Sequence, residues 1–273
     1  MGVRTVAAAV LGFCTLVLGS AGPLGAATVD DAYRLFYASR FEESAAAAAE
    51  LTAANPGDLV AWEIRTSALH FQLKRLVGEG KDKKGAFARC ADCPKLLATF
   101  IEDVNRGRAA ARARLVKDPM DDEATFLLGK MDLNYLWLQL ATLERKTGWD
   151  EYWEAKRLLD AVIQKYPTHV RARVARAWMD YIVGTRVPWG TRWVMGGGSK
   201  SRGLKMVREA AQTPADFYTR VEAQFGLWEM LTRDGKRAEA LVVAKELLVT
   251  FPENKDLVRF VESGGQPPPQ PPA

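Results

Sequence analysis

Hydrophobic residues recur along most of this chain at the three- and four-residue spacing of amphipathic helices. The stretch from Trp149 to Gly184 shows the pattern best, with apolar faces on both sides of Tyr166-Pro167. Proline has no amide hydrogen and disfavours helix in the residue before it, so the first apolar face ends there. The stretch therefore predicts two antiparallel helices joined at a tight corner.

The same spacing predicts helices over most of the remaining chain. We expect them in these segments: 29–54 (a pair that turns near Arg40), 58–76, a long helix ending at Lys117, 121–146, 200–211, 215–233, 238–250 and a short helix ending at Glu262. No segment of four to eight residues alternates cleanly between turns, so no strand is expected.

Two stretches interrupt the helical pattern and are predicted to be inserted loops. Residues 77–93 contain Gly78, Gly80 and the lysine-rich run KDKKG, and residues 185–199 contain Pro188, Trp189 and three consecutive glycines. The last ten residues, 264–273, read GGQPPPQPPA and are expected to be a disordered, proline-rich tail. The folded domain is therefore expected over residues 28–263.

Four helix-ending prolines define a repeated unit: Pro56, Pro119, Pro167 and Pro252. Twelve residues before each proline lies a small side chain that lets a neighbouring helix approach closely: Ser44, Gly107, Ala155 and Ala240. Small packing residues and a corner proline are typical of tetratricopeptide (TPR) repeats. The prolines are further apart than the ideal period of about 34 residues, so the repeats are degenerate and interrupted.

These features predict an all-α fold of TPR-like antiparallel helix pairs, stacked as a right-handed α-solenoid without a β-sheet. Such an array has a concave face that can bind a partner. We expect this groove to be lined by the first helix of each pair, in residues 58–76, 121–146, 168–183 and 215–233.

Beyond the generic repeat, several short motifs suggest a family. They include Asp118-Pro119-Met120-Asp121-Asp122-Glu123-Ala124, Arg171-Ala172-Arg173, Gly196-Gly197-Gly198-Ser199-Lys200 and Phe251-Pro252-Glu253-Asn254. On these motifs, residues 118–255 resemble exported bacterial TPR-like proteins of undetermined function. They are also loosely similar to the periplasmic T component of tripartite solute transporters. The resemblance implies an exported helical-repeat protein and does not transfer a partner.

Composition and the N-terminal pattern indicate a cellular location. The 273 residues are 48% hydrophobic and carry a formal net charge of +5, far from the density of a nucleic-acid binder. Arg4, an apolar run over residues 5–18 and small residues up to Ala27 are typical of a cleaved signal peptide, here residues 1–27. Lipid attachment at Cys14 is disfavoured because Phe13 fits poorly before a lipidated cysteine. The mature chain is thus expected to be periplasmic or secreted, without a transmembrane segment.

Cys90 and Cys93 are the cysteines that would remain after signal removal. In an oxidising compartment, a structural or labile disulfide between them is favoured over free thiols and over metal or redox chemistry. A haem attachment would need His where Pro94 stands, and a zinc site would need further ligands near the pair. No metal and no cofactor are expected.

An aromatic and basic region is the candidate binding site. It comprises Trp178, Tyr181, Arg186, Trp189, Arg192 and Trp193. The region could contact an acidic peptide, a glycan or lipid headgroups. The favoured interpretation is that the tryptophans pack between repeat units while the arginines are solvated. The neighbouring run GGGSKS at residues 196–201 departs from the phosphate-loop spacing, so helix initiation is favoured there over anion binding.

No catalytic constellation emerges, since His70 and His169 lie in different units without an evident nucleophile. The leading hypothesis is a non-enzymatic scaffold of the bacterial cell envelope that binds a protein or peptide. The alternative is a periplasmic small-ligand carrier or transporter accessory protein, in which Trp178, Tyr181, Trp189 and Trp193 close a pocket. A hydrolase of unknown type is the third reading.

Overall fold

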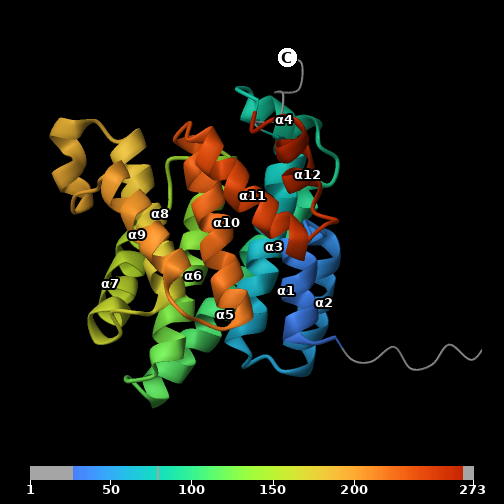
Figure 1. Ribbon diagram of the computed structural model, residues 1–273. Helices are drawn as coiled ribbons and strands as arrows, with labels where there is room; N and C mark the ends of the chain where they lie inside the picture. The colour runs from blue at the N-terminus through green and yellow to red at the C-terminus, as the bar shows by residue number, and fades with distance from the viewer. Residues whose placement is uncertain (1–26, 79, 267–273) are drawn as a thin grey trace, which may run out of the picture.

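The computed structural model describes residues 27–78 and 80–266, and within these ranges every regular element is a helix (Figure 1). Residues 1–26 of the expected signal peptide, including Cys14, and residues 267–273 of the proline-rich tail lie outside the described residues. The first helices of successive pairs, called inner helices below, are α1 (Val29–Tyr37), α3 (Leu59–Val77), α6 (Asp122–Trp137), α8 (Val170–Arg186) and α10 (Phe217–Arg233). The second helices are α2 (Phe41–Ala54), α5 (Cys93–Lys117), α7 (Trp149–Lys165), α9 (Lys200–Gln212) and α11 (Arg237–Thr250).

The structure corrects three of the expected boundaries. The expected loop at 77–93 contains α4 (Lys83–Arg89), which forms because the Asp82 carboxylate accepts a hydrogen bond from the Gly85 amide. The expected loop at 185–199 contains a 3₁₀ helix, η2 (Trp189–Met195). The helix expected to reach residue 146 leaves α geometry after Trp137 and continues as a single π turn, η1 (Leu138–Thr142).

The four proline corners share one hydrogen-bonding pattern. The residue before each proline accepts a bond from the backbone amide two residues after the proline, at 2.9–3.1 Å. That later residue then caps the next helix through its side chain, accepting an amide hydrogen three residues further on at 2.8–3.2 Å. The capping residues are Asp58, Asp121, His169 and Asn254. Each corner therefore ends one helix and starts the next within four residues.

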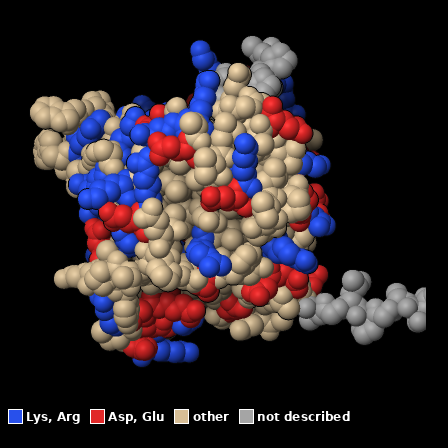
Figure 2. Space-filling view, viewed as in Figure 1, with Lys and Arg blue, Asp and Glu red and all other residues tan. Residues whose placement is uncertain are grey.

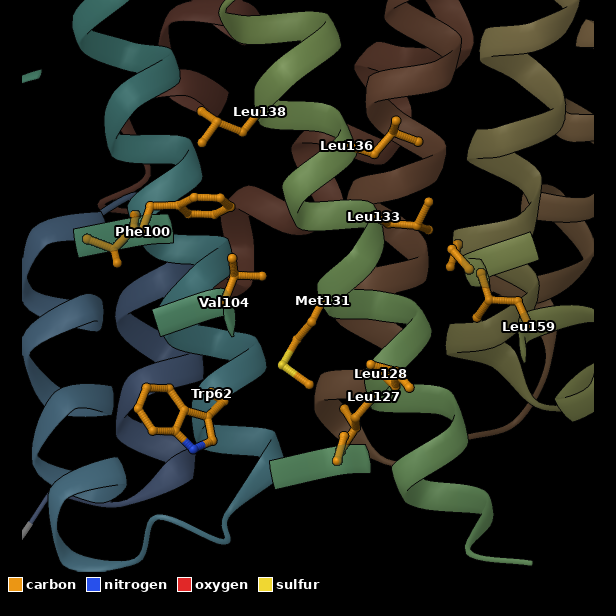
Figure 3. Packing of buried hydrophobic residues seen from close by; sticks show 14 of the residues in the cluster. Trp62, Phe100, Val104, Leu127, Leu128, Met131, Leu133, Leu136, Leu138 and Leu159 are labelled. Atoms are coloured by element: carbon orange, nitrogen blue, oxygen red, sulfur yellow. The ribbon is translucent and has the colours of Figure 1, made fainter. Parts of the chain in front are cut away.

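The small residues of the repeat lie at helix contacts, as their spacing predicts. Ser44, Ala155 and Ala240 are fully buried, and a Cβ at Gly107 would lie 2.5 Å from the Met131 sulfur. Each helix from α5 to α12 contacts the next, and successive inner helices also contact one another. Figure 3 shows the core between α3, α5 and α6, where Met131 points toward Trp62.

The two ends of the array meet, which the sequence does not predict. Tyr33 and Tyr37 of α1 stack on Tyr218 and Phe225 of α10, each pair at 5.1 Å between ring centroids. The Asn254 amide donates a 2.6 Å hydrogen bond to the Tyr37 carbonyl at the start of α12 (Lys255–Glu262). Figure 1 accordingly shows α1 beside α10 and α12. The array is closed on itself rather than open at both ends.

Two helical glycines provide a matched test of this packing. A Cβ at Gly203 would lie 2.6 Å from the Ala177 carbonyl oxygen, whereas a Cβ at Gly129 would meet its neighbours at ordinary contact distance, 3.4 Å. We expect Gly203→Ala to lower the free energy of unfolding by about 1–3 kcal/mol, because α8 and α9 must separate. Gly129→Ala should be neutral or stabilising by up to about 1 kcal/mol. Urea unfolding of both variants checks this; equal effects would contradict the close α8–α9 contact.

Candidate functional site

Four charged side chains, of which Glu63 is buried and the other three are partly buried, join the inner helices. They are Glu63 of α3, Lys130 of α6, Arg171 of α8 and Glu222 of α10, and they are called the charged quartet below. Arg171 contacts Glu222 at 2.5 Å and Glu63 at 2.9 Å, while Lys130 contacts Glu222 at 2.6 Å and Glu63 at 3.6 Å. Each carboxylate therefore meets both cations, and the formal charges cancel.

The cations of the charged quartet stabilise the ionised form of Glu222. Burial alone would raise the pKa of Glu222, but the charges of Arg171 and Lys130 outweigh it and lower the pKa to about 2. The Arg171 guanidinium also lies 5.3 Å from the Phe126 ring centroid and 5.6 Å from that of Tyr33. Charges and rings thus fill the middle of the face on which the sequence predicts an open groove.

A hollow remains at one end of this face, where inner helices α3, α6, α8 and α10 begin. Its volume is about 420 Å³. Phe126, Arg171 and Val60 contribute to its wall, and the His169 ring lies 4.7 Å from the Phe126 ring. Burial lowers the pKa of His169, and its Nδ1 accepts the Ala172 amide hydrogen, so the ring is neutral at pH 7. The hollow therefore combines aromatic faces with a fixed cation whose charge is already balanced.

Carboxylates surround the mouth of the hollow. Asp122 pairs with Lys165 at 2.6 Å, and Glu123 pairs with Arg114 at 2.8 Å. Asp216 caps α10 by accepting the Thr219 amide hydrogen at 3.0 Å, and among the described residues it has no ion-pair partner. Figure 2 shows acidic side chains gathered along the lower edge, where Figure 1 places the start of α8 and the α5–α6 corner.

Trp178 and Tyr181 of the predicted binding site lie within the helix packing. Tyr181 is buried, and its ring meets the partly buried Trp178 edge-on at 5.9 Å. The Arg233 guanidinium of α10 lies 5.7 Å from the Trp178 ring centroid. These two aromatic residues join α8 to its neighbours, and neither lines the hollow at the helix starts.

Trp189 and Trp193 are exposed to solvent, so the prediction that they pack between repeat units is wrong. Their exposed fractions are 85% and 78%, and no residue of η2 is buried. Arg186 is also exposed, whereas Arg192 donates hydrogen bonds to the carbonyls of Gly184 and Val187. The four aromatic residues of the carrier hypothesis are therefore not brought together around one hollow.

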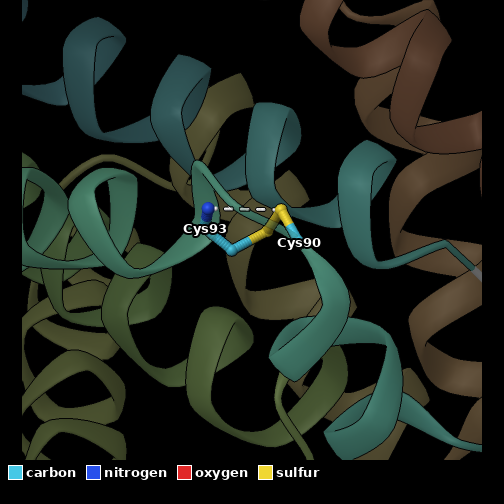
Figure 4. The surroundings of a disulfide bond; sticks show 2 residues. All are labelled: Cys90 and Cys93. Atoms are coloured by element: carbon cyan, nitrogen blue, oxygen red, sulfur yellow. Dashed lines mark hydrogen bonds between the residues drawn. A yellow bond between two sulfur atoms is a disulfide. The ribbon is translucent and has the colours of Figure 1, made fainter.

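The cysteine pair forms the predicted disulfide, at the junction of α4 and α5 (Figure 4). The Cys93 amide also donates a hydrogen bond to the Cys90 sulfur at 3.2 Å. In the GGGSKS run, Ser199 caps α9, and a Cβ at Gly198 would lie 2.4 Å from Val183. These glycines let α9 begin against the end of α8, which agrees with helix initiation.

The other candidate groups considered in the sequence show no sign of a catalytic or metal site among the described residues. His70 is buried with its Nε2 3.1 Å from the Thr142 hydroxyl, and burial lowers its pKa to about 3. Within residues 27–78 and 80–266, no three His, Cys, Asp or Glu side chains are grouped to hold a metal ion. No helix in these ranges is long and apolar enough to cross a membrane.

No protein-family model matches this chain, and no curated protein matches it significantly. The site must therefore be judged on its own residues. Sequence reasoning missed the charged quartet and the hollow. The available cue was a charged residue inside a broad apolar helix face, such as Glu63 between Trp62 and Ile64 or Lys130 beside Met131.

Replacing Glu222 with Gln tests the charged quartet, because Lys130 and Arg171 are then left with one carboxylate. We expect the free energy of unfolding at pH 7 to fall by about 3–5 kcal/mol. The folded-state pKa of Glu222, about 2, lies below the ordinary value of 4.5. Its contribution is therefore complete above pH 4.5 and is lost as pH falls toward 2. Urea unfolding at several pH values should show the two proteins converging between pH 4.5 and 3.

The control is Glu43→Gln, which breaks the exposed pair with Arg40 and should change stability by no more than about 1 kcal/mol. A Glu222→Gln variant that unfolds like wild type at pH 7, or whose deficit is the same at pH 7 and pH 3, would contradict the assigned role of the carboxylate.

Proposed function

We propose that this protein is a non-enzymatic scaffold of the bacterial cell envelope that binds a protein or peptide partner. Its helix pairs are proposed to be degenerate TPR-like units, stacked as a short right-handed α-solenoid. The repeated proline corners and the contacts between successive inner helices support this architecture. The Cys90–Cys93 disulfide and the signal-like N-terminal sequence support the envelope location.

The hollow at the starts of the inner helices carries this proposal. It is large enough for one or two side chains of an extended segment, and its wall offers the rings of Phe126 and His169. Arg171 repels an incoming basic side chain only weakly, because Glu63 and Glu222 balance its charge. The rim adds carboxylates, of which Asp216 has no ion-pair partner among the described residues. This chemistry fits a lysine or arginine side chain lying over the rings with its charged end at Asp216.

Asp216→Asn tests the proposal while keeping the helix cap, since asparagine caps helices about as well as aspartate. We expect the variant to fold normally and to bind basic peptides about tenfold more weakly, because a charge-assisted hydrogen bond is lost. The measurement is fluorescence anisotropy, with peptides chosen from an array of short sequences that differ in Lys and Arg content.

Asp150→Asn is the matched control, because Asp150 is an exposed carboxylate in the first turn of α7 and does not line the hollow. It should bind as wild type does. Preference for acidic peptides, or equal affinity of the two variants, would contradict the assignment of the hollow to a basic side chain.

A further inference from the structure

The segment from Gly184 to Ser199, called the tryptophan lobe below, presents large apolar side chains to solvent. Trp189, Trp193 and Val194 have exposed fractions of 85%, 78% and 53%. Most other aromatic side chains of the described chain are buried or partly buried. In Figure 2, uncharged side chains project at the upper left, where Figure 1 draws this segment, with Lys and Arg beside them.

Hydrogen bonds anchor the tryptophan lobe to the rest of the fold. Arg192 donates to the Gly184 carbonyl at 2.6 Å and to the Val187 carbonyl at 2.9 Å. The Tyr152 hydroxyl of α7 donates to the Met195 carbonyl at 2.8 Å, and Gly196 closes the 3₁₀ turn with φ of 70°. The backbone that carries the two indoles is therefore fixed by hydrogen bonds, and both rings remain exposed to water in the folded protein.

The charged residues of the tryptophan lobe are all basic. From Tyr181 through Arg208 the sequence contains six basic residues and no acidic residue. Lys200 and Arg202 pair with Asp234 and Asp180, which come from outside this stretch. Arg186 and Arg192, the charged residues inside the lobe, have no carboxylate partner among the described residues. The exposed indoles thus lie next to uncompensated positive charge.

We propose that the tryptophan lobe docks the protein onto an anionic phospholipid surface. Indole rings favour the boundary between headgroups and acyl chains, because the ring is apolar and its N–H remains hydrogen-bonded. Arginine beside them binds lipid phosphate. A projecting lobe suits insertion into a soft interface, whereas a protein partner would need a groove to enclose it.

This surface is separate from the hollow. The hollow lies at the start of α8 and the tryptophan lobe follows its end, so they are about 25 Å apart along the helix axis. A protein docked through the tryptophan lobe would keep the hollow accessible to a partner. Membrane docking therefore does not depend on the proposed peptide binding and can be tested alone.

Vesicle co-sedimentation tests the proposal, using the chain that begins at residue 28, the expected product of signal removal. We expect binding to vesicles of mixed phosphatidylglycerol and phosphatidylcholine and weaker binding to phosphatidylcholine alone. The double variant Trp189→Ala/Trp193→Ala should lose about tenfold or more in partitioning, because two large apolar side chains leave the interface. Arg186→Gln should weaken binding to the anionic vesicles and reduce its dependence on salt.

Val249→Ala is the control, since Val249 is an exposed apolar residue (85%) in the last turn of α11, outside the lobe. It should partition as wild type does, and circular dichroism should show all variants equally helical. Failure of the wild-type chain to bind anionic vesicles would overturn the proposal. So would equal partitioning of the double variant and wild type, or binding of the lobe to an acidic peptide in place of vesicles.

Discussion

Placing charged groups inside a protein is costly, and the arrangement of the inner helices depends on how this cost is offset in the charged quartet. Glu63 and Glu222 each contact both Lys130 and Arg171, so the four charges are all paired only when α3, α6, α8 and α10 lie together. Removal of one member leaves a buried charge without enough partners. The apolar helix faces drive association, and we infer that the charged quartet selects one relative placement of the four helices.

This placement decides which surfaces remain for binding. The middle of the face formed by the inner helices is filled by the charged quartet and by the rings around Arg171, and α1 closes against α10 through Tyr33 and Tyr37. Space is left at the starts of the inner helices, where the hollow lies. At the other end of α8, the tryptophan lobe projects into solvent. The two proposed interactions therefore use opposite ends of the same helix.

Local information was enough to predict most helices, their proline corners and the disulfide, because these features are set by a few neighbouring residues. Ser44, Gly107, Ala155 and Ala240 could be recognised from spacing alone. The charged quartet could not, since Glu63 and Glu222 are distant in sequence and their pairing with Lys130 and Arg171 depends on how the helices pack. The exposure of Trp189 and Trp193 was mispredicted, because their burial depends on whether another helix covers η2, and none of the described helices does.

The central claim is that charge pairing across distant helices fixes the relative placement of α3, α6, α8 and α10. A double-mutant cycle on Glu63→Gln and Arg171→Met tests it most directly, because the pair joins α3 to α8 at 2.9 Å. Urea unfolding of wild type, both single variants and the double variant at pH 7 gives the coupling free energy. We predict a coupling of about 1.5–3 kcal/mol, as found for residues within one buried network. A coupling below about 0.5 kcal/mol, the level of independent sites, would contradict the account.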